Sequence, residues 1–456
     1  MKLAVLVLAA GKGTRMKSRI PKILHPILGI PMIKYVLNSV NELKPDKVIL
    51  VVGKDDDKVK SELENYRVEY TYQSEQLGTG HAAKCAESAL KRFNGNILIV
   101  NGDFPLITSK TLKNFLKHHI NNRSGLSLMI AELENPTGYG RIIRDNLGNI
   151  ADVIEEKDCT TTQKKIKEIN AGSYLVESKI LWQCLDKISD NNAQNEYYLP
   201  DMVRISLIRG IKISAYESNN SEEMIGINDR YQLYMVESIM KMRINKGLMQ
   251  AGVHIIDPAS TYISPLSSIN QDTTIYPNSF VIGESVIGEN TVIGASTWIE
   301  DSKIGKNVHI KMNCWIEKSK ISDNVQIGPF AHIRPDTVIA SNSKIGNFVE
   351  LKNSKIGNSS KVPHLSYIGD ATLGNNVNIG AGTITCNYDG FKKHKTIIED
   401  DVFIGSDTML VAPLKIGKNS TTGAGSTITK DVDENSLAIS RAKQTMISNW
   451  IRKPKL

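Results

Sequence analysis

From about residue 253 to the end of the chain, isoleucine, leucine or valine recurs every six residues and sometimes every five. The apolar residue is often followed by glycine, as in "IGESVIGENTVIGAS". This period matches neither the 3.6 residues of an α-helix turn nor the two-residue alternation of a half-buried strand. It is typical of a parallel β-helix, in which one hexad forms one flat side and three hexads form a coil. We therefore predict a triangular column whose aliphatic side chains stack along its axis.

The positions expected to point into this column share the six-residue spacing. They are Ile282, Ile287, Ile293, Ile299, Ile304, Ile310, Ile316, Ile321, Ile327, Ile333, Ile339, Ile345, Leu351, Ile356, Val362, Ile368, Leu373 and Ile379. Residues 282, 299, 316 and 333 lie 17 apart, which fits three hexads with one shortened corner. The segment "TCNYDGFKKHKT" (385–396) interrupts the pattern, which resumes in a shifted register. We expect a protruding loop there, and loops on rigid repeats often carry function.

The first half of the chain has a different pattern, in which short apolar runs alternate with stretches of helical periodicity. The runs expected to form buried strands are 3–10, 47–52 and 96–101. Residues 31–43 and 80–93 are predicted to be crossover helices. This alternation predicts a doubly wound, Rossmann-like α/β domain over residues 1–228, with a mainly parallel sheet. Ligands of such domains bind at the carboxyl ends of the strands.

The two halves are joined by one stretch with helical spacing. Its apolar residues are Leu233, Val236, Ile239, Met240 and Ile244. Asn228 and Asp229 are both suitable N-caps. We therefore predict a single linking helix over residues 229–252, followed by the β-helix over residues 253–456.

The opening segment "MKLAVLVLAAGKGTRMKSRIPK" allows two interpretations. Its apolar run resembles a short secretion signal, but Leu8 stands where cleavage after Ala10 needs a small residue. Read as a buried strand, the run delivers the turn Gly11–Arg15 to a phosphate. Small residues there let the backbone approach a nucleotide closely, and successive N–H groups can form an anion-binding nest. Arg15 and Lys22 add positive charge, although a glycine turn alone also fits a purely structural bend.

Composition limits the size class and the environment. The 456 residues exceed one ordinary core, and no uncharged apolar stretch is long enough for a membrane helix. The five cysteines are scattered and show no CxxC spacing, which argues against a disulfide framework and fits a reducing cytoplasm. The formal charge of +8 suits anionic small molecules, and no dense basic stripe favours nucleic acid. We therefore expect a cytoplasmic protein that acts on small molecules.

Several motifs follow the glycine turn in order along the first half. They are "QSEQLGTGHA" (73–82), "NGDFPL" (101–106), "GYGRI" (138–142), "EEKD" (155–158), "EINAG" (168–172) and "GINDR" (226–230). Together with "LAAGKGTRM" (8–16), they resemble the signature of sugar nucleotidyltransferases. This order favours the phosphate turn over both the secretion signal and the structural bend.

The second half carries motifs of its own. They are "IRPDT" (333–337), "ELKNS" (350–354), "KVPHLSYIGDA" (361–371), "NVNIGAGTITCNYDG" (376–390), "IGSDT" (404–408), "GAGS" (423–426) and "SRAKQ" (440–444). Nearly end to end, the chain resembles the family of bifunctional N-acetylglucosamine-1-phosphate uridyltransferases and glucosamine-1-phosphate acetyltransferases. The resemblance implies that the β-helix is left-handed.

The resemblance also implies two reactions. Acetyl-CoA would acetylate the amine of glucosamine 1-phosphate, and UTP would then donate a uridylyl group to N-acetylglucosamine 1-phosphate with release of pyrophosphate. The product, UDP-N-acetylglucosamine, serves peptidoglycan and lipopolysaccharide synthesis. Members of the family are homotrimers with acetyl-CoA sites between neighbouring chains. The expected partners are small-molecule substrates, with no nucleic acid and no membrane insertion.

At the first site the sugar phosphate attacks the α-phosphorus in line, so the protein must position two polyanions and neutralise their charge. The resemblance implies that Asp103 and the amide oxygen of Asn228 hold Mg²⁺, while Lys22 and Arg15 stabilise charge on the phosphates. The residues implied for UTP and UDP-N-acetylglucosamine are Leu8, Ala9, Ala10, Gly11, Lys22, Gln73, Gly78, Thr79, Asn101, Gly102, Asp103, Gly140, Glu155, Asn170 and Asn228. Asp103 as a turn residue and Asn228 as a mere helix cap are the structural alternatives.

At the second site an amine must lose a proton as it attacks acetyl-CoA, and an imidazole accepts protons near neutral pH. His364 is the candidate base, and a surface or interface histidine is the structural alternative. Arg334 and Lys352 lie 18 residues apart, one full coil, so we expect them to stack on one edge and clamp the same phosphate. The resemblance adds Tyr367 and Asn378 for the amino sugar. For acetyl-CoA it adds Ala381, Asn387, Tyr388, Ser406, Ala424 and Arg441.

Two other functions compete with this interpretation. A single-activity sugar-nucleotide pyrophosphorylase with a structural or regulatory β-helix would not need the HLSY and CNYDG motifs. A non-enzymatic regulatory module would be expected to have lost Lys22 or Asp103, and both are present.

Overall fold

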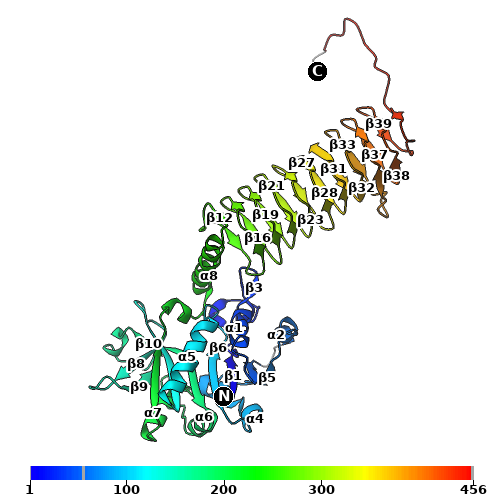
Figure 1. The fold of residues 1–456 in the computed structure, drawn as a ribbon. Helices are drawn as coiled ribbons and strands as arrows, with labels where there is room; N and C mark the ends of the chain where they lie inside the picture. The colour runs from blue at the N-terminus through cyan, green and yellow to red at the C-terminus, as the bar shows by residue number, and fades with distance from the viewer. Residues whose placement is uncertain (1, 54–56, 453–456) are drawn as a thin grey trace. The chain divides into compact units, whose positions relative to one another are not determined.

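The computed structural model describes residues 2–53 and 57–452, and Figure 1 shows its helices and strands. The chain divides into two compact units, Met1–Met240 and Lys241–Leu456. The boundary between them falls inside helix α8 (Arg230–Gln250), within the expected linking segment. The domain limits at residues 228 and 252 stay predictions.

A nine-stranded sheet forms the centre of the first unit, with the strand order β11-β7-β10-β6-β1-β4-β5 and a β8–β9 extension. The strands are β1 (Leu3–Leu8), β4 (Lys47–Val52), β5 (Glu69–Tyr72), β6 (Asn96–Asn101), β7 (Leu126–Glu132), β8 (Gly140–Arg144), β9 (Ile150–Ile154), β10 (Glu168–Glu177) and β11 (Ile213–Glu217). A short hairpin of β2 (Pro26–Ile27) and β3 (Ile30–Pro31) lies apart from this sheet. The sheet is mixed, because β10 runs antiparallel to β6, β7 and β8.

The opening apolar run is the central strand of this sheet. β1 pairs in parallel with both β4 and β6, and all six of its residues are buried. A strand covered on both faces is apolar throughout, because neither side of its pleat meets water. Its carboxyl end therefore delivers the glycine turn to the edge of the sheet where ligands bind.

Helices pack around the sheet and connect its strands. They are α1 (Met32–Asn41), α2 (Asp57–Glu62), α3 (Thr79–Lys84), α4 (Glu87–Leu90), α5 (Ser109–Asn122), α6 (Ser178–Leu185) and α7 (Asp201–Ile208), with 3₁₀ turns η1 (Thr14–Met16), η2 (Lys22–Leu24), η3 (Gln163–Lys165) and η4 (Ser221–Met224). The single helix predicted over residues 80–93 is wrong, since α3 and α4 are separate. The chain tightens at Ala86, whose N–H bonds the carbonyl of Ala83 three residues back and so interrupts the α-helical ladder.

The second unit is a column of three parallel sheets, one on each side of a triangular prism (Figure 1). The first sheet contains β12 (His254–Ile255), β15 (Thr274–Ile275), β18 (Val292–Ile293), β21 (His309–Ile310), β24 (Gln326–Ile327), β27 (Lys344–Asn347), β30 (Lys361–His364), β33 (Asn378–Ile379), β36 (Phe403–Ile404), β39 (Thr421–Thr422) and β41 (Leu437–Ala438). The second contains β13 (Tyr262–Ile263), β16 (Phe280–Ile282), β19 (Trp298–Glu300), β22 (Trp315–Glu317), β25 (His332–Ile333), β28 (Glu350–Lys352), β31 (Tyr367–Gly369), β34 (Ile384–Cys386), β37 (Met409–Val411) and β40 (Thr427–Ile428). The third contains β14 (Ser268–Ile269), β17 (Val286–Ile287), β20 (Lys303–Ile304), β23 (Lys320–Ile321), β26 (Val338–Ile339), β29 (Lys355–Ile356), β32 (Ala371–Leu373), β35 (Thr396–Ile398) and β38 (Leu414–Ile416).

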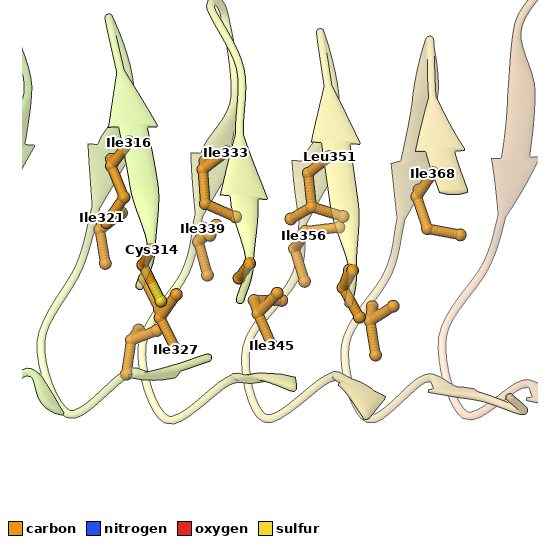
Figure 2. Close-up of a cluster of buried hydrophobic side chains, with 14 of the residues drawn as sticks. Cys314, Ile316, Ile321, Ile327, Ile333, Ile339, Ile345, Leu351, Ile356 and Ile368 are labelled. Atoms are coloured by element: carbon orange, nitrogen blue, oxygen red, sulfur yellow. The ribbon is translucent and has the colours of Figure 1, made fainter. Parts of the chain in front are cut away.

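The aliphatic hexad residues fill the inside of the column in vertical rows. Figure 2 shows one row of Ile316, Ile333, Leu351 and Ile368, each at the same position of successive coils. Each of these side chains is completely buried. We call each inward-pointing aliphatic residue a rung. Because the rung of one coil packs on the equivalent rung of the next, only the rungs at the two ends of the column can meet water, and the stack forms a hydrophobic core.

One predicted rung is wrong. Ile282 was expected to point inward, but β16 pairs with β19 so that Val281 lies opposite Ile299 and Ile282 lies opposite Glu300. Val281 is fully buried, while Ile282 is partly exposed on the outer side. The spacing from this coil to the next is therefore 18 residues, and two adjacent aliphatics in "FVIG" concealed the choice.

The interruption predicted at residues 385–396 is present as a shorter loop over residues 387–395, because residues 385–386 belong to β34 and residue 396 to β35. The repeat then resumes with Ile398, Ile404, Leu410 and Ile416, all buried as expected. At the other end of the unit, Ile244 and Leu248 of α8 pack against the first rungs of the core. Asp229 rather than Asn228 caps this helix, since its Oδ1 accepts the N–H of Gln232 at 2.8 Å.

Over the described residues, none of the helices combines the length and the apolar character that crossing a membrane requires.

Candidate active sites

A cavity of about 800 Å³ opens at the carboxyl ends of β1 and β6 in the first unit. It is lined by most of the residues expected to bind the nucleotide sugar: Leu8, Ala10, Gly11, Arg15, Gln73, Gly78, Thr79, Asn101, Asp103, Gly140, Glu155, Asn170 and Asn228. These residues come from segments more than 200 residues apart. The fold therefore gathers the ordered motifs around one space.

Ala9 and Gly102 do not line this cavity. The N–H of Gly102 donates to the carbonyl of Leu8 at 2.8 Å, and a Cβ at Gly102 would lie 3.1 Å from the Cβ of Ala9. Their small size lets the ends of β1 and β6 meet behind the cavity wall. These two residues therefore have a packing role here, and their expected contact with the nucleotide sugar stays a prediction.

Lys22 lies beside the cavity, where its ammonium joins the two residues expected to hold a metal. The ammonium forms an ion pair with Asp103, and it donates to the amide oxygen of Asn228 at 3.0 Å. The approach depends on Gly13, which has a φ of 61° and whose Cβ would lie only 2.7 Å from the Cβ of Lys22. A side chain at residue 13 would displace this lysine.

The same contacts show that Asp103 and Asn228 can serve one cation. Their oxygens converge on a single ammonium, and a carboxylate with an amide oxygen is a donor set suited to Mg²⁺. Mg²⁺ commonly takes only one or two protein ligands and completes its shell with phosphates and water. Among the described residues there is no cluster of three or more His, Cys, Asp or Glu side chains that could hold a metal ion alone. The residues therefore fit a metal that arrives with a polyphosphate.

The far wall of the cavity is acidic and well ordered by hydrogen bonds. Asn170 is buried, donates to the hydroxyl of Tyr174 at 2.6 Å and accepts the N–H of Gly172 at 3.1 Å. Glu155 is half-buried on this wall. Burial, followed by the nearby charges of Asp158, Asp201 and Glu196, raises the pKa of Glu155 to about 7. This wall offers hydroxyl-binding amide and carboxyl groups rather than positive charge.

The opposite end of the cavity holds the residues expected to contact the base and ribose. Gln73 is buried, and its Nε2 donates to the carbonyl of Gly78 at 2.9 Å. The hydroxyl of Thr79 accepts the N–H of Leu199 at 3.1 Å. These contacts fix the turn between β5 and α3 against the segment that leads into α7.

In the second unit, His364 lies at the end of β30, on the corner between the first and second sheets. It is exposed, and its Nδ1 lies 2.6 Å from the Oδ1 of Asn347, its neighbour one coil earlier. Because a carbonyl oxygen only accepts, this contact requires the proton on Nδ1, and in a neutral imidazole Nε2 is then the nitrogen that can accept a proton. This arrangement is compatible with the expected role of His364 as the base, which stays a prediction.

Arg334 and Lys352 occupy the next corner, at the end of the second sheet. Ile333 pairs with Leu351, and the N–H of Arg334 donates to the carbonyl of Leu351 at 2.9 Å, so the two cations stand on successive coils as predicted. Arg334 also contacts Glu350 at 2.7 Å. Tyr367 follows on the same face one coil later, opposite Glu350. One face thus carries His364 near one corner and two cations at the other.

Asp370 organises this cationic corner, and the sequence motifs did not single it out. It is buried, and its carboxylate accepts from Asn353 at 2.6 Å and from Asn387 at 2.5 Å, with Lys352 at 3.7 Å. Burial raises the pKa of Asp370, but these hydrogen bonds and the Lys352 charge outweigh it and hold the pKa below its usual range. The ionised Asp370 thereby ties the interrupting loop to the column.

Three of the residues expected to bind acetyl-CoA, Ala381, Ser406 and Ala424, form a vertical series on the corner that bears His364, whereas Asn387 and Tyr388 lie on the interrupting loop after β34, at the corner of Lys352 and Asp370. The N–H of Asp407 donates to the carbonyl of Ala381 at 2.6 Å, and that of Gly425 to the carbonyl of Ser406 at 2.8 Å, so these turns stack directly. Ala424 continues the series, and its carbonyl accepts from Arg441 at 2.6 Å. Tyr388 is exposed on the interrupting loop.

Asn378 lies on a different face of the prism from Tyr367, the other residue that the resemblance adds for the amino sugar. It lies on β33 in the first sheet, opposite Lys361, whereas Tyr367 lies in the second sheet. Within one chain the two residues therefore belong to different faces of the prism.

Comparison with known proteins agrees with both units. Residues 5–156 match the model of the MobA-like NTP transferase domain. Residues 285–318 match the hexapeptide repeat of succinyl-transferase, and residues 318–353 and 395–430 match the bacterial transferase hexapeptide model.

The full length of the chain is also matched by curated relatives. Each is named bifunctional protein GlmU. The protein of Geotalea daltonii is 48% identical over 455 residues and 100% of both chains. That of Halalkalibacterium halodurans is 46% identical over 98% of both chains, and that of Syntrophotalea carbinolica is 48% identical over 98% of this chain and 96% of its own. The chain belongs to the GlmU family.

Membership in the GlmU family confirms the expected class of enzyme. The chain is a bifunctional transferase with a nucleotidyltransferase unit and a hexapeptide acyltransferase unit. The two competing functions, a single-activity pyrophosphorylase and a non-enzymatic module, are therefore not favoured.

The structure adds residues that the motif reading of this GlmU-family chain missed. The further residues that line the first cavity include Lys12, Thr14, Gln76, Tyr139, Glu196 and Gln232. Lys12 and Tyr139 lie inside the motifs LAAGKGTRM and GYGRI, and this position could have identified them as residues that line the cavity. At the second site, the Lys352 ammonium lowers the pKa of Lys393 by direct contact, which places this loop lysine beside the cationic corner. The charge of the loop draws attention to Lys393 in the sequence, but its contact with Lys352 could not be predicted, because the loop alone brings the two together.

Proposed function

We propose that this GlmU-family enzyme first acetylates glucosamine 1-phosphate with acetyl-CoA and then converts N-acetylglucosamine 1-phosphate and UTP to UDP-N-acetylglucosamine and pyrophosphate. The observation that carries the proposal is the meeting of Lys22, Asp103 and Asn228 beside a cavity lined by the nucleotide-sugar motifs. The stacked turns of Ala381, Ser406 and Ala424, on the corner that bears His364, support the proposal for acetyl transfer.

For uridylyl transfer, the chain binds two anions and aligns them. Asp103 and Asn228 would hold Mg²⁺, which supplies charge neutralisation between the phosphates. Arg15 and the backbone of Gly11 face the triphosphate, while Gly140, Glu155 and Asn170 orient the sugar. Alignment of the sugar phosphate oxygen with the α-phosphorus supplies most of the acceleration, because no covalent enzyme intermediate is needed.

For acetyl transfer, the amine of glucosamine 1-phosphate attacks the thioester carbonyl of acetyl-CoA. His364 Nε2 accepts the proton that the amine loses, the new C–N bond forms, and the C–S bond breaks to release CoA. Arg334 and Lys352 hold the phosphate at the opposite corner of the face. The acetyl-CoA would follow the series Ala381, Ser406 and Ala424 with Arg441 beside it. Asn387 and Tyr388 would contribute from the interrupting loop at the other corner of the second sheet.

We also propose that the working form is a cytoplasmic homotrimer. The separation of Asn378 from Tyr367 supports this, because the face of one prism can be completed by the neighbouring face of another copy. Asn378 would then reach the amino sugar held by a different chain.

A coupled assay of the full chain tests the two-step proposal. With glucosamine 1-phosphate as the only sugar, acetyl-CoA alone should release thiol, UTP alone should release little pyrophosphate, and both together should release pyrophosphate. Pyrophosphate release from UTP and glucosamine 1-phosphate at the full rate, without acetyl-CoA, would contradict the proposed order.

A further inference from the structure

Tyr139 connects the sugar side of the first cavity with the segment that carries Asn228. It lies in the turn 136–139 before β8 and lines the cavity. Its hydroxyl donates to the carbonyl of Met224 and accepts the N–H of Gly226, both at 3.2 Å. Burial raises the pKa of Tyr139, so the hydroxyl stays protonated and able to donate. One hydroxyl therefore holds two backbone groups, the nearer of them two residues before Asn228.

The segment 224–228 is mostly buried, and further contacts hold it near its end. The N–H of Ile227 donates to the carbonyl of Asp103 at 3.1 Å, which joins the two metal-binding segments directly. The N–H of Asn228 donates to Oε1 of Gln232 at 2.7 Å. A Cβ at Gly226 would lie 3.1 Å from the ring of Phe104, so this backbone packs closely on the residue after Asp103. The amide oxygen of Asn228 itself accepts from the Lys22 ammonium at 3.0 Å, so the backbone contacts of this segment set where Asn228 meets Lys22 and Asp103.

Tyr139 is itself held by a buried cation. The guanidinium of Arg141 donates to the carbonyl of Tyr139, and it pairs with Glu156 at 2.6 Å. Arg141 is 1% exposed, so this anchor is shielded from water. A continuous series of contacts therefore runs from Glu156, next to the sugar-facing Glu155, through Tyr139 to the segment of Asn228.

We propose that Tyr139, together with Gln232, is a positioning residue that holds the Asn228 amide oxygen at the metal site. The inference rests on the proposed function, because it takes Asp103 and Asn228 as the metal ligands. Outer partners of this kind orient the ligands themselves, and their loss typically lowers metal affinity or activity by about 10- to 100-fold.

Mn²⁺ binding to the full-length enzyme tests the proposal without turnover. The enzyme is saturated with UDP-N-acetylglucosamine, no pyrophosphate is added, and free Mn²⁺ is measured by electron paramagnetic resonance. Tyr139→Phe removes only the hydroxyl, and Gln232→Met replaces the side-chain amide, including the oxygen that accepts the N–H of Asn228. We expect each change to weaken Mn²⁺ binding by about 10-fold. Tyr66→Phe is the matched control, because its hydroxyl contacts Asn38 at 2.9 Å and does not line the cavity.

A second measurement separates positioning from general damage. If Tyr139 acts through the metal ligand, saturating Mg²⁺ should restore the kcat of Tyr139→Phe to within about threefold of the parent enzyme. A merely structural role would lower the melting temperature and leave a defect that Mg²⁺ does not restore. That result, with unchanged Mn²⁺ affinity, overturns the inference.

Asp103→Ala shows whether a failed test concerns the positioning role of Tyr139 and Gln232 or the metal site itself. If Asp103→Ala loses Mn²⁺ while Tyr139→Phe and Gln232→Met retain parental affinity, the positioning role is wrong and the metal site stands. If Asp103→Ala binds Mn²⁺ as the parent does, the metal site itself is wrong, and the positioning role falls with it.

Discussion

At the scale of single residues, each proposed site depends on a few polar contacts whose partners are far apart in the sequence. Lys22, Asp103 and Asn228 meet although up to 206 residues separate them. His364 obtains its orientation from Asn347 one coil away. Removal of one such group should affect one reaction and leave the other intact.

Asp103→Ala should lower uridylyl transfer by at least about 100-fold, because the change removes a metal ligand rather than an outer partner. Acetyl transfer should stay within twofold. Pyrophosphate release and thiol release from the same preparation give the two rates. Normal uridylyl turnover in this variant would show that another group holds the metal.

His364→Ala should lower acetyl transfer by about 10²- to 10⁴-fold, which is the usual contribution of a general base. Uridylyl transfer serves as the internal control for folding. Acetylation that survives within about tenfold would mean that a different group accepts the proton.

Glu155 makes the stability of the first unit depend on pH. Its pKa is raised from the ordinary 4.5 to about 7, so the folded form binds a proton more tightly than the unfolded chain does. The stabilisation from this proton is complete below about pH 4.5 and is lost as the pH rises toward 7. Glu155→Gln, which cannot ionise, should make the melting temperature of the first unit less dependent on pH between about pH 4.5 and 7. An unchanged pH profile would argue against the shifted carboxyl.

At the scale of elements, the rungs of the β-helix carry its stability. Ile316 is completely buried between rungs of the neighbouring coils. Ile316→Ala should therefore lower the free energy of unfolding of the second unit by about 2–5 kcal/mol, because it leaves a cavity in a stack that cannot collapse. Lys320→Ala, on the outside of the next strand, should change it by less than about 0.5 kcal/mol. Urea unfolding of both variants makes the comparison, and equal effects would contradict the rung model.

At the scale of the whole molecule, the two units form separate cores and contain separate candidate sites. All residues that line the first cavity lie between Leu8 and Gln232. A chain that ends after Gln250, and so keeps α8 complete, should retain uridylyl transfer within about threefold and lose acetyl transfer. A folded fragment without uridylyl activity would show that the β-helix contributes to the first site.

Local patterns predicted the repeat and much of the first site. A rung contacts only the same position in the next coil, so spacing alone placed Ile316, Ile333, Leu351 and Ile368 in one row. Arg334 and Lys352 could be aligned for the same reason. At Val281 and Ile282 two aliphatic residues are adjacent, so spacing could not show which of them points inward. Strand pairing with Ile299 and Glu300 shows that it is Val281.

Contacts between distant segments were decided only by the tertiary structure. The hydroxyl of Tyr139 meets Met224 and Gly226 after more than 80 intervening residues, and the ammonium of Lys22 meets the amide oxygen of Asn228 after more than 200. Such pairs have no period and no spacing rule, because they form where separate elements pack. The sequence by itself determined which elements form and which chemical groups are available, since those depend on neighbours along the chain. Which groups share a cavity depended on the packing of the whole sheet and column.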